Sequence, residues 1–199
     1  MASFPAPADA PPLILASSSP YRRELLERLR LAFGVQVPDI DESPADGESP
    51  RALALRLACE KASRISSRNS GAVVIGSDQV VECAGRSLGK PGTHALAIEQ
   101  LSALQSQQIT FHTAVCVTDG QRCRQQVVPT VVQMRPLNNA QIQRYVEREP
   151  ALDCAGAFRS EALGICLFER LHSDDPTALI GLPLIATVNL LSEFGFTLP

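Results

Sequence analysis

Two neighbouring stretches of the chain alternate apolar and polar side chains, and this alternation constrains the fold more than any other feature. The stretches are residues 108–118 and 124–134, and a turn at Gly120 lies between them. Side chains of a strand point alternately to its two faces, so the pattern predicts two long antiparallel strands joined by a hairpin. A chain with this hairpin cannot form a purely parallel sheet.

Short apolar runs and helix-start signals surround the hairpin. Residues 12–17 (PLILAS) and 72–78 (AVVIGSD) are typical of buried strands. Ser19 and Ser49, each followed by proline, are typical of the N-cap and first position of a helix. We therefore expect an α/β fold in which a mixed, twisted sheet carries flanking helices.

The remaining elements follow from the same signals. Further strands are expected at 33–38 and over GICLFERL (164–171), and a hairpin around Ala84 and Gly85 within 80–92. Further helices are expected to end near Arg30, Ser67 and Leu104, and to span 138–148 and 184–195.

Composition and charge exclude several classes of function. The chain has 199 residues, 45% of them apolar, which suffices for one hydrophobic core, and its net charge of −3 argues against sequence-independent nucleic-acid binding. No stretch approaches the roughly 20 apolar residues of a membrane helix, so no membrane partner is expected. Residues 1–11 are rich in Pro and Ala and lack a basic n-region, which predicts a disordered extension before a single domain over 12–199.

The six cysteines form no CxxC or zinc-finger spacing with histidine. Most have apolar neighbours in the sequence, which favours reduced, buried cysteines in a cytoplasmic protein. The sequence leaves the oligomeric state open, with a homodimer among the options.

Basic side chains occur where a polyphosphate could bind. Arg22 and Arg23 fall in the first turn of a helix, whose unpaired N–H groups already carry partial positive charge, so an anion is expected opposite them. The eighteen basic residues include only two lysines, Lys61 and Lys90. A lysine ammonium suits phosphate oxygens, although a surface lysine lying along its own helix is the alternative.

Acidic side chains accompany them. Asp78 follows a buried strand, and the end of such a strand is where open α/β sheets usually hold ligands; the alternative is a turn or helix-capping aspartate. Glu42 lies in an acidic loop and could contribute to a Mg²⁺ site, whereas a solvated loop is the alternative.

Several segments, in this order, resemble the Maf family of nucleotide pyrophosphatases. They are SSSPYRR (17–23), IDE (40–42), ACEKA around Lys61, GSDQVV (76–81), LGKP (88–91), TFHTAV (110–115), CAGAFRSEALG (154–164) and LIGLPL (179–184). The resemblance implies two lobes around a central cleft, similar to the inosine-triphosphate pyrophosphatases, and cleavage of a nucleoside triphosphate between its α and β phosphates.

The resemblance also implies roles for individual residues. Asp78 matches the general base, and Glu42 together with Asp78 matches the surroundings of a divalent metal cation (Mg, Mn or Co). The phosphate-binding set it implies is Ser17, Ser19, Arg22, Arg23, Lys61 and Lys90. This agrees with the charge pattern, because positive groups stabilise a polyphosphate and its leaving pyrophosphate.

Three positions distinguish subgroups of the family. Tyr21, Gln79 and Glu161 differ from the pyrimidine-directed pattern and resemble the subgroup that acts on 7-methyl-GTP. An aromatic ring attracts the cationic N7-methylguanine by about 0.5–2 kcal/mol, and a carboxylate can accept two hydrogen bonds from a guanine edge. For Glu161 the alternative is an ion pair with Arg159.

Two other functions stay open at this level. One is a pyrophosphatase for dTTP, UTP or other non-standard nucleotides. The other is a non-catalytic nucleotide-binding regulator of cell division, which would not need Asp78 as a base.

Overall fold

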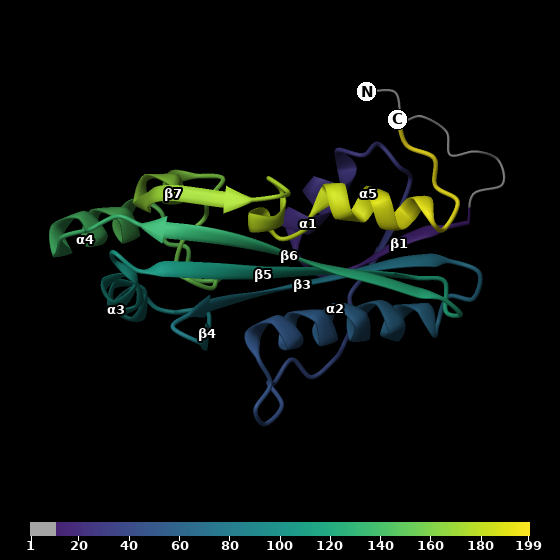
Figure 1. Cartoon of the computed structure of the whole chain (residues 1–199), viewed down its shortest axis with the longest axis horizontal. Helices are drawn as coiled ribbons and strands as arrows, with labels where there is room; N and C mark the ends of the chain where they lie inside the picture. The colour runs from purple at the N-terminus through teal and green to yellow at the C-terminus, as the bar shows by residue number, and fades with distance from the viewer. Residues whose placement is uncertain (1–10) are drawn as a thin grey trace.

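The computed structural model describes residues 11–199, which form a seven-stranded mixed sheet with helices on both faces (Figure 1). The extension expected over residues 1–11 lies, except for Pro11, outside the described residues. The strands are β1 (Leu13–Ala16), β2 (Gly34–Gln36), β3 (Val73–Cys83), β4 (Arg86–Leu88), β5 (Gln108–Thr118), β6 (Cys123–Met134) and β7 (Phe168–Ser173). The helices are α1 (Pro20–Glu27), α2 (Pro50–Ser66), α3 (His94–Leu104), α4 (Asn139–Arg148) and α5 (Leu184–Ser192), with short 3-10 helices η1 (Leu163–Leu167) and η2 (Ala178–Ile180).

The sheet combines parallel and antiparallel pairs, as expected. Its strands lie in the order β2-β1-β3-β5-β6-β7, and β4 pairs with β3. Strand β1 is parallel to both of its neighbours, whereas β3, β5, β6 and β7 pair antiparallel in succession. The hairpin of β5 and β6 turns at Gly120, whose φ of +89° favours glycine.

Local capping signals set the helix starts. The Ser19 hydroxyl accepts a hydrogen bond from Arg22 N at 3.4 Å, and Ser49 caps α2 in the same way. The ends are less well predicted, because α1 stops at Glu27 rather than near Arg30, and α5 stops at Ser192. None of the helices in residues 11–199 is long and apolar enough to cross a membrane.

Two strand expectations are wrong. Strand β3 does not end at Asp78 but continues to Cys83, because β5 pairs with it along this whole length. Asp78 therefore lies in the middle of a strand, opposite Ala114. The segment 164–171 is not one strand either, since η1 occupies its first part and β7 begins only at Phe168.

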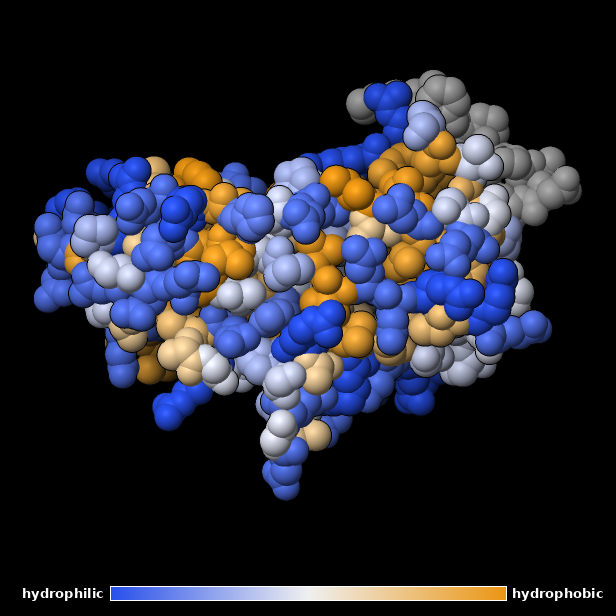
Figure 2. All heavy atoms as spheres, viewed as in Figure 1, coloured by the Kyte–Doolittle hydropathy of each residue, from blue (hydrophilic) through white to orange (hydrophobic). Residues whose placement is uncertain are grey.

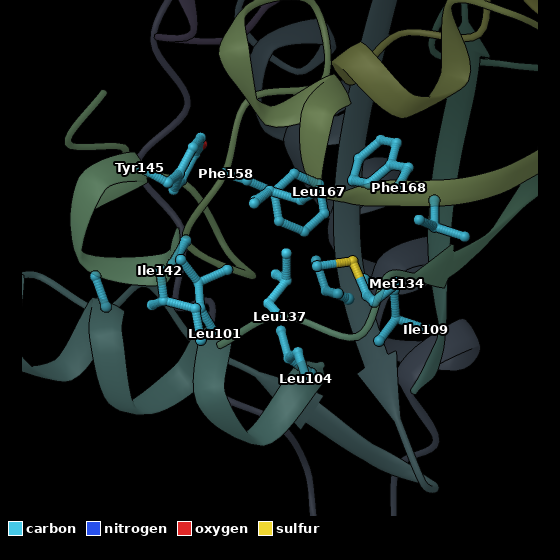
Figure 3. Close-up of a cluster of buried hydrophobic side chains, with 14 of the residues drawn as sticks. Leu101, Leu104, Ile109, Met134, Leu137, Ile142, Tyr145, Phe158, Leu167 and Phe168 are labelled. Carbon is cyan, nitrogen blue, oxygen red and sulfur yellow. The ribbon is translucent and has the colours of Figure 1, made fainter. Parts of the chain in front are cut away.

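Three apolar clusters form the core. One packs α1 and α5 on one face of the sheet, and a second packs α2 on the opposite face (Figure 1). The third fills the end of the molecule where α3 and α4 lie, around side chains such as Leu101, Met134 and Phe158 (Figure 3). In Figure 2 a hollow in the outline separates the part formed by α4 and β7 from the part formed by α5.

Helix α2 approaches the sheet most closely at Gly76 of β3. A Cβ atom added there would lie 2.2 Å from Ala58 O and 2.7 Å from Ala62 N. Only glycine permits this backbone contact. The contact brings Lys61 of α2 over Asp78, two residues further along β3.

All six cysteines are free, as expected. The expectation that they are buried is wrong for most of them, since only Cys116 is fully buried, and Cys123 and Cys166 are exposed. Apolar neighbours in the sequence do not fix burial, because alternate residues of an edge or loop segment face solvent.

Candidate active site

A polar pocket of about 370 Å³ lies between the start of α1, the acidic loop before α2, the middle of β3 and the loops around residues 153–161 and 179–181. The predicted site residues that line it are Ser19, Tyr21, Arg22, Glu42, Lys61, Asp78, Gln79, Lys90 and Glu161. The fold thus brings together side chains that are up to 142 residues apart (19 to 161) in the sequence.

Lys61 lies at the centre of the charged groups. Its Nζ is 2.5 Å from Asp78 Oδ1 and 2.7 Å from Glu42 Oε1. The Lys61 and Asp78 side chains are only 8% and 9% exposed, whereas the Glu42 side chain is 60% exposed. Lys61 is therefore not the surface lysine of the alternative interpretation, but a buried ammonium between two carboxylates.

The basic groups of the pocket shift the ionisation of their neighbours. Partial burial alone would raise the pKa of Glu42, but the Lys61 hydrogen bond and the charges of Lys61, Lys90 and Arg22 together lower it. Burial lowers the pKa of Arg22, and the Asp78 and Glu42 carboxylates oppose that shift. The pocket thus holds ionised groups of both signs close together.

The two arginines of α1 point in different directions. Arg22 lines the pocket, and its Nε donates to Gly181 O at 2.9 Å. Arg23 is not among the lining residues, because its Nε pairs with Glu27 and its side chain is 63% exposed. Successive helical residues are rotated by about 100°, so the two adjacent side chains leave the helix in different directions. Ser17 is likewise outside the lining; it is buried and accepts from Ser19 N at 3.0 Å.

Gln79 holds the segment that closes one side of the pocket. Its Nε2 donates to the carbonyl oxygens of Ala178 and Leu179 at 2.9 and 3.1 Å and lies 2.9 Å from Thr113 Oγ1. Ser77 and Thr113 hold the same segment, through Gly181 O and Ala178 O. The amide nitrogen of Gln79 is thus bonded to protein rather than directed at the pocket.

Arg159 is a lining residue that was not predicted as a functional residue. Its NH1 donates to the Tyr21 hydroxyl at 3.1 Å, and its Nε lies 3.2 Å from Glu149 Oε1. The Tyr21 hydrogen bond is the main cause that raises the pKa of Arg159. Arg159 therefore pairs with Glu149 and not with Glu161, which was the alternative interpretation of Glu161. The Glu161 carboxylate instead accepts a hydrogen bond from Ser160 Oγ at 3.2 Å.

Two phenylalanines, also not predicted, form an apolar wall. Phe111 of β5 and Phe158 line the pocket, and their rings meet edge to face with centroids 5.6 Å apart. Phe158 lies within the CAGAFRSEALG segment, so the motif itself was the signal for both Phe158 and Arg159. A ring-lined wall beside charged groups suits a ligand with an aromatic base and an anionic tail.

The carboxylates fit a divalent metal cation. Glu42 Oε1 and Asp78 Oδ1 both contact Lys61 Nζ, so the two carboxylates lie close together at one side of the pocket. Oxygen ligands suit Mg²⁺, which commonly binds one or two carboxylates and completes its shell with water and phosphate oxygens. Two carboxylates in a pocket that Arg22 and Lys90 also line meet this description.

Residues 12–194 match the family model described as Maf-like protein. The chain belongs to the Maf-like family. This confirms the resemblance predicted from the ordered motifs, and the mixed α/β fold is consistent with it.

Curated relatives match the Maf-like chain over nearly its whole length. It is 54% identical over 189 residues to a protein of Xanthomonas oryzae pv. oryzae, covering 95% of this chain and 100% of that protein. It is 54% identical over 188 residues to a protein of Cupriavidus pinatubonensis, covering 94% of each, and 52% identical over 185 residues to one of Bordetella avium, covering 93% and 94%. All three relatives are named 7-methyl-GTP pyrophosphatase.

Proposed function

We propose that this protein hydrolyses 7-methyl-GTP to 7-methyl-GMP and pyrophosphate. The observation that carries the proposal is the Lys61–Asp78–Glu42 cluster within a pocket that Arg22 and Lys90 also line. The names of the relatives support the same substrate.

The phosphates are bound by the basic groups in this proposal. Arg22, Lys61 and Lys90 neutralise the triphosphate, and Ser19 and the N–H groups at the start of α1 donate to it. Ser17 orients this turn through its hydrogen bond with Ser19 N. Arg23, paired with Glu27 outside the pocket, contributes only long-range attraction to the triphosphate.

Asp78 acts as the general base that accepts a proton from the attacking water. Lys61 contacts its Oδ1, which fixes the carboxylate and leaves Oδ2 as the acceptor. A divalent cation (Mg²⁺, Mn²⁺ or Co²⁺) held by Glu42 and Asp78 would supply positive charge to the phosphate oxygens. Lys61 and Arg22 stabilise the charge that develops on the leaving pyrophosphate.

Base selection rests on Tyr21 and Glu161. The Tyr21 ring, fixed by the hydrogen bond from Arg159, stacks on the cationic methylated base, and the Glu161 carboxylate accepts from guanine N1–H and its amino group. Gln79 affects specificity indirectly, because it positions the segment from Ala178 to Gly181.

The test is pyrophosphate release by the purified protein with 7-methyl-GTP, dTTP and UTP, each in the presence of Mg²⁺. We expect the highest kcat/KM with 7-methyl-GTP. Asp78→Asn should lower turnover by about 10²–10⁴-fold while nucleotide binding, measured by calorimetry, persists. Equal turnover of the three nucleotides would contradict 7-methyl-GTP as the preferred substrate. An active Asp78→Asn variant would contradict the role of Asp78 as the general base.

A further inference from the structure

Three cysteine thiols converge outside the nucleotide pocket. Cys59 lies on α2, Cys116 on β5 and Cys123 at the start of β6. Their sulfur atoms all lie within 4.8 Å of one another, and the Sγ atoms of Cys116 and Cys123 are 3.2 Å apart. The sequence gives no sign of this cluster, because Cys59 is 57 residues from Cys116 (59 to 116) and no CxxC spacing is present.

The surroundings of the cluster suit an ion that arrives from solvent. Cys116 is fully buried, Cys59 is half-buried and Cys123 is exposed, so the thiols form a path from the surface inward. Gln125 adds an amide oxygen, since its Oε1 lies 2.6 Å from Cys59 Sγ. The hydrogen bond from Cys116 lowers the pKa of the Cys59 thiol, although burial opposes this.

We propose that Cys59, Cys116 and Cys123 form a binding site for one thiophilic d¹⁰ cation, Zn²⁺ or Cu⁺. Thiolates select such soft ions over Mg²⁺. With a metal–sulfur bond of about 2.3 Å, tetrahedral geometry places sulfur atoms about 3.8 Å apart, between the 3.2 Å that separates Cys116 and Cys123 and the 4.8 Å within which all three sulfurs lie. Each bound thiol releases its proton to solvent, and no electrons are transferred.

Zn²⁺ requires a fourth ligand beside the three sulfurs, and an oxygen atom supplies it. Gln125 Oε1 completes a tetrahedral Zn²⁺ site, whereas Cu⁺ binds the three sulfurs alone. The two ions therefore share one set of thiolates and differ in their need for Gln125.

The site would fasten α2 to the sheet beside the Lys61–Asp78 pair. Cys59 lies two residues before Lys61 on α2, and Cys116 lies two residues after Ala114, which pairs with Asp78 across the sheet. Residues two apart on a strand share a face, so Cys116 and Ala114 both face α2. Bound metal would thus resist separation of the elements that carry Lys61 and Asp78.

The test measures metal binding without nucleotide, so its failure would not be mistaken for failure of the proposed hydrolase. The metal-free full chain, reduced with a phosphine and kept anaerobic, is titrated with Zn²⁺ or Cu⁺ against a chromophoric chelator of each ion. We expect one equivalent of at least one ion per chain and a higher melting temperature when that ion is bound. Gln125→Ala should weaken Zn²⁺ binding but leave Cu⁺ binding unchanged.

Single substitutions identify the ligands. Cys123→Ser, at an exposed position that should not disturb folding, is expected to weaken binding by at least about tenfold and to abolish the rise in melting temperature. The same is expected for Cys59→Ser, whereas the control Cys166→Ser, which removes an exposed cysteine outside the cluster, should behave as wild type. Three results would each overturn the proposal. The first is stoichiometric binding that survives both Cys123→Ser and Cys59→Ser, and the second is no binding of either ion. The third is a Cys116–Cys123 disulfide that persists in the reductant.

Discussion

Lys61 reaches from α2 to Asp78 on β3, and the two side chains form a buried ion pair with Nζ 2.5 Å from Oδ1. Helix and strand are held at this distance by backbone contact at Gly76, not by the charges alone. Removal of two charges from water costs free energy, so a buried pair is weak evidence for stability and stronger evidence for a site that uses charge.

Replacement of the two lysines should separate stability from phosphate binding. Lys61→Met leaves Asp78 buried without its cation, so the free energy of unfolding should fall by about 3 kcal/mol. Lys90→Met, at an exposed position, should change stability by less than about 0.5 kcal/mol but lower kcat/KM about tenfold or more. Urea denaturation and steady-state kinetics measure both quantities.

Arg86→Met is the matched control for the lysine variants, because Arg86 is exposed on β4 and is not a lining residue of the pocket. It should leave stability and kinetics unchanged. Equal stability losses for Lys61→Met and Lys90→Met would contradict the buried position of Lys61.

Gly76→Ala should force α2 away from β3. The added Cβ would lie 2.2 Å from Ala58 O, a backbone atom that cannot move alone, so we expect a loss of about 1–3 kcal/mol or more in stability and a large loss of activity. Gly34→Ala is the control, since no atom lies within 4 Å of its Cβ position. If thermal melting ranks the two variants as equal, the close contact does not set the helix position.

Glu161→Gln should change the choice of base. One carboxylate oxygen becomes an amide donor facing a guanine N–H, so kcat/KM for 7-methyl-GTP should fall much more than for UTP or dTTP. Measurement of kcat/KM for 7-methyl-GTP, UTP and dTTP, in the variant and in the wild type, tests this prediction. An equal loss with all three would mean that Glu161 positions the loop rather than reads the base.

Tyr21 should act through its ring more than through its hydroxyl. Tyr21→Phe removes the hydrogen bond from Arg159 but keeps the stacking surface, so it should cost less kcat/KM for 7-methyl-GTP than Tyr21→Ala does. With UTP the two variants should differ little. A larger loss in Tyr21→Phe would assign the role to the hydroxyl and Arg159.

The acidic loop before α2 should loosen in acid. Glu48 forms two hydrogen bonds with Arg56, at 2.8 and 2.9 Å, and these lower the pKa of Glu48 to about 2 from its ordinary 4.5. Because the folded state has the lower pKa, the stabilisation is present above pH 4.5 and is lost as the pH falls towards 2. Glu48→Gln should therefore be less stable than wild type at neutral pH, and the difference in unfolding free energy should shrink at pH 3. If the difference in unfolding free energy stayed the same from neutral pH to pH 3, the ionised Glu48 carboxylate would contribute nothing to stability.

The sequence predicted elements whose signals are local. Alternation of side chains gave β5 and β6, and Ser19 and Ser49 marked the starts of α1 and α2, because both signals arise within a few residues of chain. The ends of α1 and α5 have no such local signal, and both helices stop earlier than predicted. The continuation of β3 past Asp78 depended on its partner β5, which its own residues do not reveal.

By itself, then, the sequence determined the α/β class, the mixed sheet, the family and most of the residues that line the pocket, since ordered motifs and periodicity are properties of the chain. Tertiary structure alone decided that Arg22 faces the pocket while Arg23 pairs with Glu27, that Gln79 supports a loop, and that Cys59 meets the two cysteines of the β5–β6 hairpin. The physical reason is that packing fixes the rotation of each helix and the register of each strand, and contacts between distant residues follow from that geometry rather than from their spacing in the chain.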